Sequence, residues 1–173
     1  SVIRRSRGFA PLPVTVPLEA QTPIMACGPE LKNTMAFLAG RNAFISQHIG
    51  DMKNAETMDH FEATANRLKD LLRLDPEVYA YDLHPLYLSA EFALAQKGRK
   101  IGVQHHHAHI ASVMAENQIT EPVLGLSCDG VGFGTDGQAW GCEILRCTYE
   151  DFERIGQLQY VPMPGGDLAS LEP

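Results

Sequence analysis

Hydrophobic positions along this chain follow a strand-like pattern in some segments and a helix-like pattern in others, and together these predict a mixed α/β fold. Short apolar runs bounded by glycine, proline or charged turns are typical of strands, and longer stretches with one apolar stripe are typical of helices. The predicted strands are 23–28, 31–39, 42–49, 78–82, 99–103, 123–128, 139–147 and 154–161. The predicted helices are 55–73, 86–97 and a third that begins at the histidine-rich segment and continues over 110–117. Strands joined by crossover helices favour a mixed sheet flanked by helices.

The same pattern divides the chain into three parts. Residues 1–22 contain several prolines and little periodicity, so we expect a linker or the tail of an upstream domain. Residues 23–121 are predicted to form a first α/β lobe. The strand pattern starts afresh over 122–173, which indicates a duplicated architecture whose second copy is cut short. The chain lacks an initiator methionine, and we expect it to be a fragment of a longer protein.

Composition narrows the class of protein. The chain has 173 residues, of which 45% are hydrophobic and 20% are charged, as is ordinary for a globular protein with a real core. It contains no run of about 20 apolar residues and no secretory signal, so we expect no membrane partner. The net charge of −7 argues against DNA binding, although Arg4, Arg5 and Arg7 form a small basic patch.

The cysteines indicate a reducing environment. The chain has four, with no Cys-x-x-Cys pair, and most lie in or beside apolar strand-like runs. We expect reduced thiols that act as small buried hydrophobes in a cytoplasmic protein. For Cys128, which precedes an aspartate, a nucleophilic thiol is the alternative.

A dense histidine cluster is the sharpest chemical feature. Residues 104–109 are Gln-His-His-His-Ala-His, at the point where a predicted strand passes into a helix. His105 and His109 are four residues apart, so on a helix they share one face, and we predict that they bind a metal ion with Asp129 as a third ligand. The intervening His107 is a candidate catalytic residue. Ordinary hydrogen-bonded histidines at a helix N-terminus are the alternative.

A glycine-rich segment lies between two later strands. Residues 129–137 are Asp-Gly-Val-Gly-Phe-Gly-Thr-Asp-Gly. Gly130, Gly132 and Gly134 would let backbone N–H groups approach phosphate oxygens closely, so we predict nucleotide phosphate binding there. The segment is neither a P-loop nor a Rossmann fingerprint, and it looks like the phosphate hairpin of actin-like ATPases. A common hairpin turn is the alternative.

Two earlier segments carry further candidates. Asp82 and His84 belong to Asp-Leu-His-Pro at the end of a predicted strand, where ligands gather in α/β sheets, and both are candidate catalytic residues. A turn with proline at the first helical position is the alternative. Lys32 lies in the turn 28–34 and is a candidate counter-charge for phosphate, with an exposed surface lysine as the alternative.

Seven segments taken together resemble the hydrogenase maturation carbamoyltransferases, the HypF family. They occur in the family's order over essentially the whole chain, and the histidine cluster with the Asp-Gly loop after it is the most specific. The segments are 4–9, 28–34, 46–51, 82–85, 105–109, 129–132 and 164–167. The resemblance implies an actin-like ATPase fold (ASKHA, Kae1-like). The chain would supply the end of a YrdC-like domain, the first lobe and the start of the second.

The resemblance also implies an activity and a metal. Members of the family use carbamoyl phosphate and ATP to form carbamoyl adenylate. They then carbamoylate the C-terminal cysteine of HypE during NiFe-hydrogenase maturation. Kae1-like enzymes bind iron or zinc through His-x-x-x-His, which maps onto His105 and His109. In the carbamoyltransferases an aspartate that maps onto Asp129 is a further ligand, and another aspartate lies beyond Pro173. The ion would hold and polarise the carbamoyl group.

The resemblance implies a limit as well. Because half of the ATP cleft would lie past Pro173, we expect the isolated chain to be inactive, to bind ATP weakly or not at all, and to dimerise through exposed surface. Two other functions stay open. One is a metal-binding or docking module without catalysis. The other is a tRNA threonylcarbamoyl-type enzyme of the same fold, although such enzymes carry an acidic residue where this chain has His107.

Overall fold

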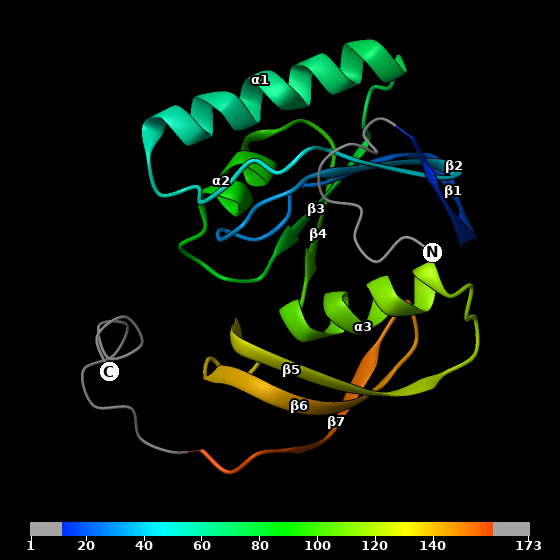
Figure 1. Cartoon of the computed structure of the whole chain (residues 1–173), viewed down its shortest axis with the longest axis vertical. Coiled ribbons are helices and arrows are strands. Elements are labelled where there is room, and N and C mark those ends of the chain that lie inside the picture. Colours follow the sequence, from blue (N-terminus) through cyan, green and yellow to red (C-terminus); the bar gives the residue numbers. More distant parts are fainter. Residues whose placement is uncertain (1–11, 161–173) are drawn as a thin grey trace.

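The computed structural model describes residues 12–160, which form two sheets and three helices (Figure 1). The first sheet contains β1 (Val14–Ala26), β2 (Ala36–Ile45), β3 (Val78–Asp82) and β4 (Arg99–Val103). The second contains β5 (Val123–Phe133), β6 (Ala139–Cys147) and β7 (Phe152–Gln157). The helices are α1 (Ala55–Leu72), α2 (Leu88–Ala95) and α3 (His105–Glu116). The predicted α/β class is confirmed. The basic patch at Arg4, Arg5 and Arg7 and the segment 164–167 lie outside the described residues.

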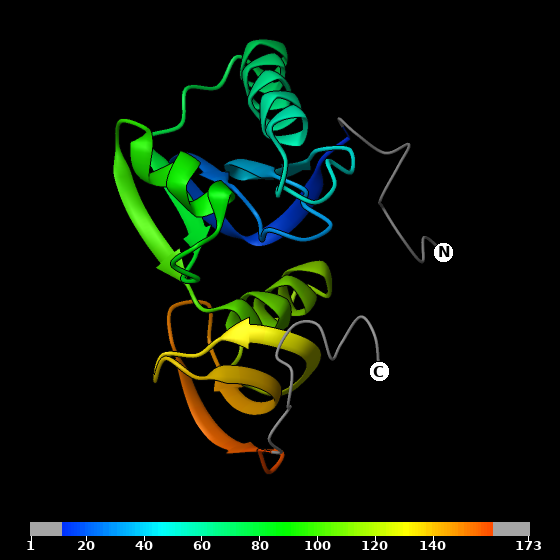
Figure 2. The same cartoon turned by 90° about the vertical axis from the view of Figure 1, so that its left-hand side faces the viewer.

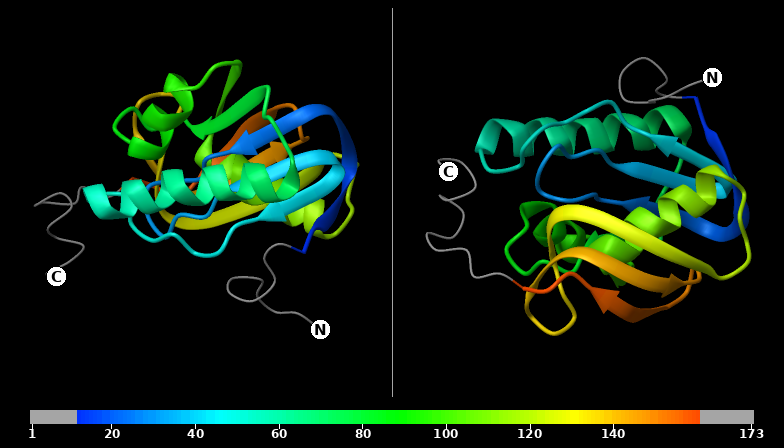
Figure 3. Two further views of the ribbon diagram at one scale, coloured as in Figure 1. Left: turned by 90° about the horizontal axis from the view of Figure 1, so that it is seen from above. Right: turned by 60° about the horizontal axis from the view of Figure 1, so that its bottom comes forward.

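The first sheet is mixed and has the order β2-β1-β3-β4. Strands β1 and β2 are antiparallel, whereas β3 and β4 run parallel to β1 and to each other. Helices α1 and α2 pack on one face of this sheet, and α1 extends across that face (Figures 2 and 3). The core between them is apolar: Met25, Phe37, Phe61, Ala65, Leu68, Tyr79 and Ala93.

The second sheet is an antiparallel meander with the order β5-β6-β7. Helix α3 lies between the two sheets, so it links the first unit to the second (Figure 1). Ile110 and Met114 on α3 pack against Trp140, Leu145 and Cys147 in a second core. The β4–α3 connection therefore carries the histidine cluster to the boundary between the two sheets.

The start of the first sheet differs from the prediction in two ways. Three short strands were expected over 23–49, but the structure has a single hairpin of β1 and β2, and 31–35 form an irregular connection. Gly40, expected to break a strand, lies within β2 at φ +56°, where the register with β1 shifts at Ala20. A glycine bulge therefore replaces the expected turn. Strand β1 also begins at Val14, so the expected linker over 1–22 is wrong from that residue on.

The helices match their predicted positions closely. α1 begins after Asn54, whose side chain accepts a hydrogen bond from the Thr57 N–H at 2.8 Å, and it ends at Arg73 in the left-handed conformation. α2 is shorter than expected at both ends. Within residues 12–160, none of the helices combines the length and the apolar character needed to cross a bilayer.

The cysteines divide into two pairs. Cys27 and Cys147 are buried, as expected for small hydrophobes. Cys128 is exposed and Cys142 is half-buried, so the prediction of buried cysteines is wrong for these two. Their positions on β5 and β6 place them on a face of the second sheet that no described helix covers.

Candidate metal centre

The N-terminus of α3 is fixed by the residue that precedes it. Gln104 is buried, and its side-chain oxygen accepts a hydrogen bond from the His107 N–H at 2.9 Å, which caps the helix. Its amide nitrogen lies 3.2 Å from both the Phe133 carbonyl and His106 Nδ1. Gln104 therefore ties α3 to β5, a role that was not predicted from the sequence. Its position directly before a histidine-rich helix was the available signal.

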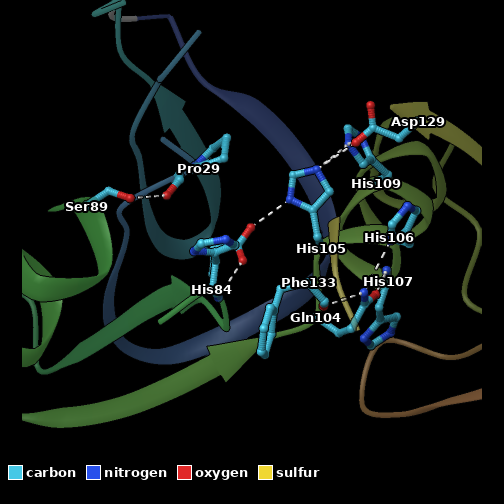
Figure 4. Close-up of polar contacts among 12 residues, drawn as sticks. Pro29, His84, Ser89, Gln104, His105, His106, His107, His109, Asp129 and Phe133 are labelled. Carbon is cyan, nitrogen blue, oxygen red and sulfur yellow. Dashed lines mark hydrogen bonds and ion pairs between the residues drawn. The ribbon is translucent and has the colours of Figure 1, made fainter. Parts of the chain in front are cut away.

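His105 lies between two carboxylates from different sheets (Figure 4). Its Nδ1 is 2.6 Å from Asp82 Oδ2, at the end of β3, and its Nε2 is 2.8 Å from Asp129 Oδ2, on β5. The hydrogen bond with Asp82 raises the pKa of His105 above its ordinary value, and burial opposes this in part. Because both ring nitrogens face carboxylate oxygens, the protonated ring can donate to both of them.

His109 completes a three-residue group. Its Nε2 lies 3.4 Å from Asp129 Oδ2 and 3.2 Å from His105 Nε2. A tetrahedral ion with bonds of about 2.0–2.1 Å to its ligands would hold their atoms roughly 3.3 Å apart. The separations from His109 Nε2 match that geometry, whereas the 2.8 Å between His105 Nε2 and Asp129 Oδ2 is a hydrogen-bond distance that would widen around an ion; the three residues form a candidate metal-binding group. Two nitrogens and one oxygen are donors suited to iron or zinc.

A bulge in β5 places Asp129 in this group. Cys128 pairs with Cys142 and Gly132 with Trp140, so the three residues 129–131 of β5 lie opposite the single residue Gly141 of β6. Such bulges re-aim side chains at functional sites. Burial raises the pKa of Asp129, but the hydrogen bond from the Gly130 N–H and the contact with His105 outweigh it. The pKa of Asp129 therefore lies below its ordinary value.

The two histidines between His105 and His109 have structural contacts. His106 is fully buried; its Nε2 donates to the Gly141 carbonyl at 2.9 Å, and burial lowers its pKa. His107 Nε2 lies 2.7 Å from the Thr148 carbonyl. The structure thus does not bring His107 to the metal group, because residues two apart on a helix face opposite sides (Figure 4).

Asp82 and His84, the candidate catalytic residues, lie beside the group. Asp82 Oδ1 accepts a hydrogen bond from the His84 N–H at 2.9 Å, while its other oxygen contacts His105. The His84 ring stacks on Tyr87 with centroids 4.1 Å apart and meets Phe133 edge-on. Asp82 therefore contacts the metal group through His105, and His84 sits at its edge.

The predicted phosphate-binding residues have different environments. Gly132 and Gly134 are buried, and a Cβ at either position would collide with His106 or Trp140 respectively, so these glycines serve close packing. Gly130 is exposed, with no atom within 4 Å of an added Cβ. Lys32 is exposed at φ +51°, and it has no ion pair among the described residues. Gly130 alone of the three loop glycines is open to a ligand.

Comparison with known proteins gives consistent results along the chain. The family model "HypF Kae1-like domain" matches residues 19–116, and the model "Carbamoyltransferase, Kae1-like Domain, second subdomain" matches 125–173. Carbamoyltransferase HypF2 of Cupriavidus necator is 42% identical over 99% of this chain and 22% of its own length. Carbamoyltransferase HypF of Rhizobium leguminosarum bv. viciae is 43% identical over 99% of this chain and 22% of its own length. The chain thus spans 22% of the length of these curated relatives.

Solved structures agree with the predicted Kae1-like fold. A crystal structure of full-length HypF in the phosphate- and nucleotide-bound form matches with a TM-score of 0.92 at 49% identity, over 96% of this chain and 26% of that one. The crystal structure of T. kodakarensis HypF matches with a TM-score of 0.87 at 42% identity, over 98% of this chain and 23% of that one. Since the first family model covers more than half of the sequence, the chain belongs to the HypF Kae1-like domain family.

Proposed function

We propose that this chain is part of a HypF-type carbamoyltransferase and contributes its catalytic metal site. The observation that carries the proposal is the convergence of His105 Nε2, His109 Nε2 and Asp129 Oδ2 within 2.8–3.4 Å of one another, close enough for all three to bind one ion. The curated relatives named above are carbamoyltransferases, and this supports the reaction class. The proposed substrates of the whole protein are carbamoyl phosphate and ATP, and the proposed acceptor is the C-terminal cysteine of HypE.

The residues of this chain have distinct roles in the proposal. Iron or zinc bound at the group would act as a Lewis acid that polarises the carbamoyl group. Asp82 accepts a hydrogen bond from His105 Nδ1–H, which would keep Nε2 of that ring directed at the ion. Because His105 Nε2 must lose its proton before it can bind an ion, metal binding releases a proton. Asp82 is thus a positioning residue rather than a group that touches substrate.

The nucleotide would lie beside the metal group. Gly130 is exposed and adjacent to Asp129, so a phosphate can approach it without a steric barrier, and its N–H, which donates to Asp129 Oδ1, would have to turn from that carboxylate to the phosphate. A related full-length HypF has been solved in a phosphate- and nucleotide-bound form, which supports nucleotide binding by the whole protein. We assign phosphate contact to Gly130 with Lys32 as a candidate counter-charge, and substrate contact to His84. We assign no catalytic role to His107, because its ring contacts the Thr148 carbonyl.

Metal binding by the chain is the first test. Purified chain, stripped of metal by chelation, is titrated with zinc and separately with ferrous iron under anaerobic conditions. We expect binding near one equivalent, abolished by the double variant His105→Ala, His109→Ala. His60→Ala is the matched control, since His60 is exposed on α1 and outside the group. Binding of less than about a tenth of an equivalent to the unmodified chain would overturn the proposed site.

Turnover is tested in a longer HypF-type protein that contains this sequence. Carbamoyl-phosphate-dependent exchange between ATP and pyrophosphate is measured before and after introducing His105→Ala and His109→Ala. A large loss of exchange is expected. Exchange that is unchanged in the double variant would favour a metal-binding or docking module without catalysis.

A tRNA-modifying activity is the second candidate function. The observation that favours it is similarity to the tRNA N6-adenosine threonylcarbamoyltransferase of Geobacter sulfurreducens, which is 28% identical over 64% of this chain. The HypF relatives are more similar and match over almost the full chain, so the carbamoyltransferase proposal is preferred.

A further inference from the structure

Two cysteines face each other across β5 and β6. Cys128 and Cys142 are direct register partners, and their Sγ atoms lie 2.8 Å apart. Opposed residues in an antiparallel pair have Cα atoms about 4.5–5.5 Å apart. Disulfides span Cα separations of about 4.4–6.8 Å. Both cysteines are free thiols in the structure. Their direct pairing across β5 and β6 gives the backbone the spacing of a cross-strand disulfide.

The pair is open to a small reagent. Side chains alternate between the two faces of the sheet, and the face that carries Cys128 and Cys142 also carries the exposed Leu126 and Ile144. The opposite face is buried, as Ser127 shows. Cys128 is exposed and Cys142 half-buried, whereas the remaining two cysteines of the chain are buried. Access therefore favours reaction of a small oxidant at this pair over the two buried thiols.

We propose that Cys128 and Cys142 form a redox site that takes a low-molecular-weight disulfide, such as glutathione disulfide, as its oxidant. Cys128 gives up its proton and bonds to one sulfur of glutathione disulfide, and the first glutathione leaves as a thiol with that proton. Cys142 then bonds to the Cys128 sulfur, and the second glutathione leaves with the Cys142 proton. Two protein thiols are oxidised to one disulfide, and one glutathione disulfide is reduced to two glutathione thiols.

The position of the pair gives the site its significance. Cys128 directly precedes the bulge that carries Asp129, and Cys142 follows Gly141, whose carbonyl accepts from His106. A disulfide would fasten β5 to β6 at the last regular pair before that bulge. The redox site does not depend on the proposed metal, since its geometry comes from strand register alone.

Peptide mapping tests the proposal directly. The chain is equilibrated with glutathione disulfide, quenched with acid and N-ethylmaleimide, and digested with trypsin and Asp-N. Both cysteines lie in one tryptic peptide, 101–146, and cleavage before Asp129 and Asp136 separates them. We expect peptides 101–128 and 136–146 to be joined, with a mass two hydrogens below their sum, and to be released by reduced glutathione.

Two variants and one gel complete the test. Cys142→Ser should lose the joined peptides and accumulate a glutathione adduct on Cys128, while circular dichroism confirms that it folds. Cys128→Ser should lose the joined peptides and react slowly at the half-buried Cys142. Recovery of both peptides as maleimide adducts after full equilibration with glutathione disulfide would overturn the proposal. Joining between chains, seen as a dimer on a non-reducing gel, would also overturn it.

Discussion

Replacing Gly132 by alanine is expected to push α3 away from β5 and to disturb the metal group. A Cβ at this position would lie 2.5 Å from His106 Cε1, 2.9 Å from His106 Nδ1 and 3.0 Å from His105 Cβ. The His106 ring cannot turn aside freely, because it is buried and bonded at both nitrogens, to Gly141 and Gln104. The helix or the strand must therefore move.

The magnitude follows from these contacts. Inserting a methyl group into a packed site costs about 1–3 kcal/mol through strain. If the His106 ring rotates instead, it gives up two hydrogen bonds worth about 0.5–1.5 kcal/mol each, which falls in the same range. For a chain of this size each kcal/mol lowers the melting temperature by about 2–4 °C. We expect Gly132→Ala to melt roughly 2–12 °C lower and to bind zinc more weakly than the unmodified chain.

Gly130→Ala is the matched control. It makes the same chemical change two residues away, at a position that is exposed, has no positive φ and has no heavy atom within 4 Å of the added Cβ. Surface changes of this kind stay within about 0.5 kcal/mol. Thermal unfolding followed by circular dichroism, with zinc titration of each variant, compares the two. Equal melting temperatures for Gly132→Ala and Gly130→Ala would refute the reasoning.

Three further changes probe other parts of the structure. Asp82→Asn keeps the side-chain size but removes the charge behind His105, so zinc affinity should fall about 10–100-fold with the fold retained, and unchanged affinity would contradict the positioning role. Burial raises the pKa of Cys27 from 9.0 to about 12. The contribution of the buried neutral thiol to the free energy of unfolding is therefore complete below pH 9.0 and is lost as the pH rises toward about 12. Urea unfolding should show the free-energy difference between the unmodified chain and Cys27→Ala narrowing by up to about 1.4 kcal/mol per pH unit, whereas a constant difference would contradict burial of this thiol. A Cβ at Gly125 would lie 2.4 Å from Ile110 Cδ1, so Gly125→Ala should cost about 1–3 kcal/mol. Adding Ile110→Ala should recover part of that loss in a double-mutant cycle, and additive losses would count against the clash.

The convergence of the three candidate metal ligands was largely predictable from local sequence. His105 and His109 share a helix face because they are four residues apart, and the helix begins where a strand ends. Asp129 was predicted from its place at the end of the next strand, although the bulge that aims it was not. The same helical phase also places His107 on the opposite face, so its separation from the group could have been inferred from the sequence.

The remaining differences depend on contacts between distant segments. In the sequence, Gly40 looks like a turn residue. Its pairing with Ala20, with a register shift on either side, shows that it forms a bulge within the strand instead. Likewise, Cys128 and Cys142 are fourteen positions apart, and no local pattern sets the register that brings their sulfurs together. Strand register is decided by which faces are buried, and this depends on the whole fold.

The bridge from Asp82 through His105 to Asp129 connects the two sheets of the chain. Asp82 ends a strand of the first sheet, Asp129 lies on the edge strand of the second, and the ring between them belongs to the helix that separates the sheets. The bridge therefore links the two sheets as well as forming part of the candidate metal-binding group. A neutral imidazole has one N–H, so loss of a proton from His105 would leave it able to donate to only one of the two carboxylates, and this link between the sheets would weaken.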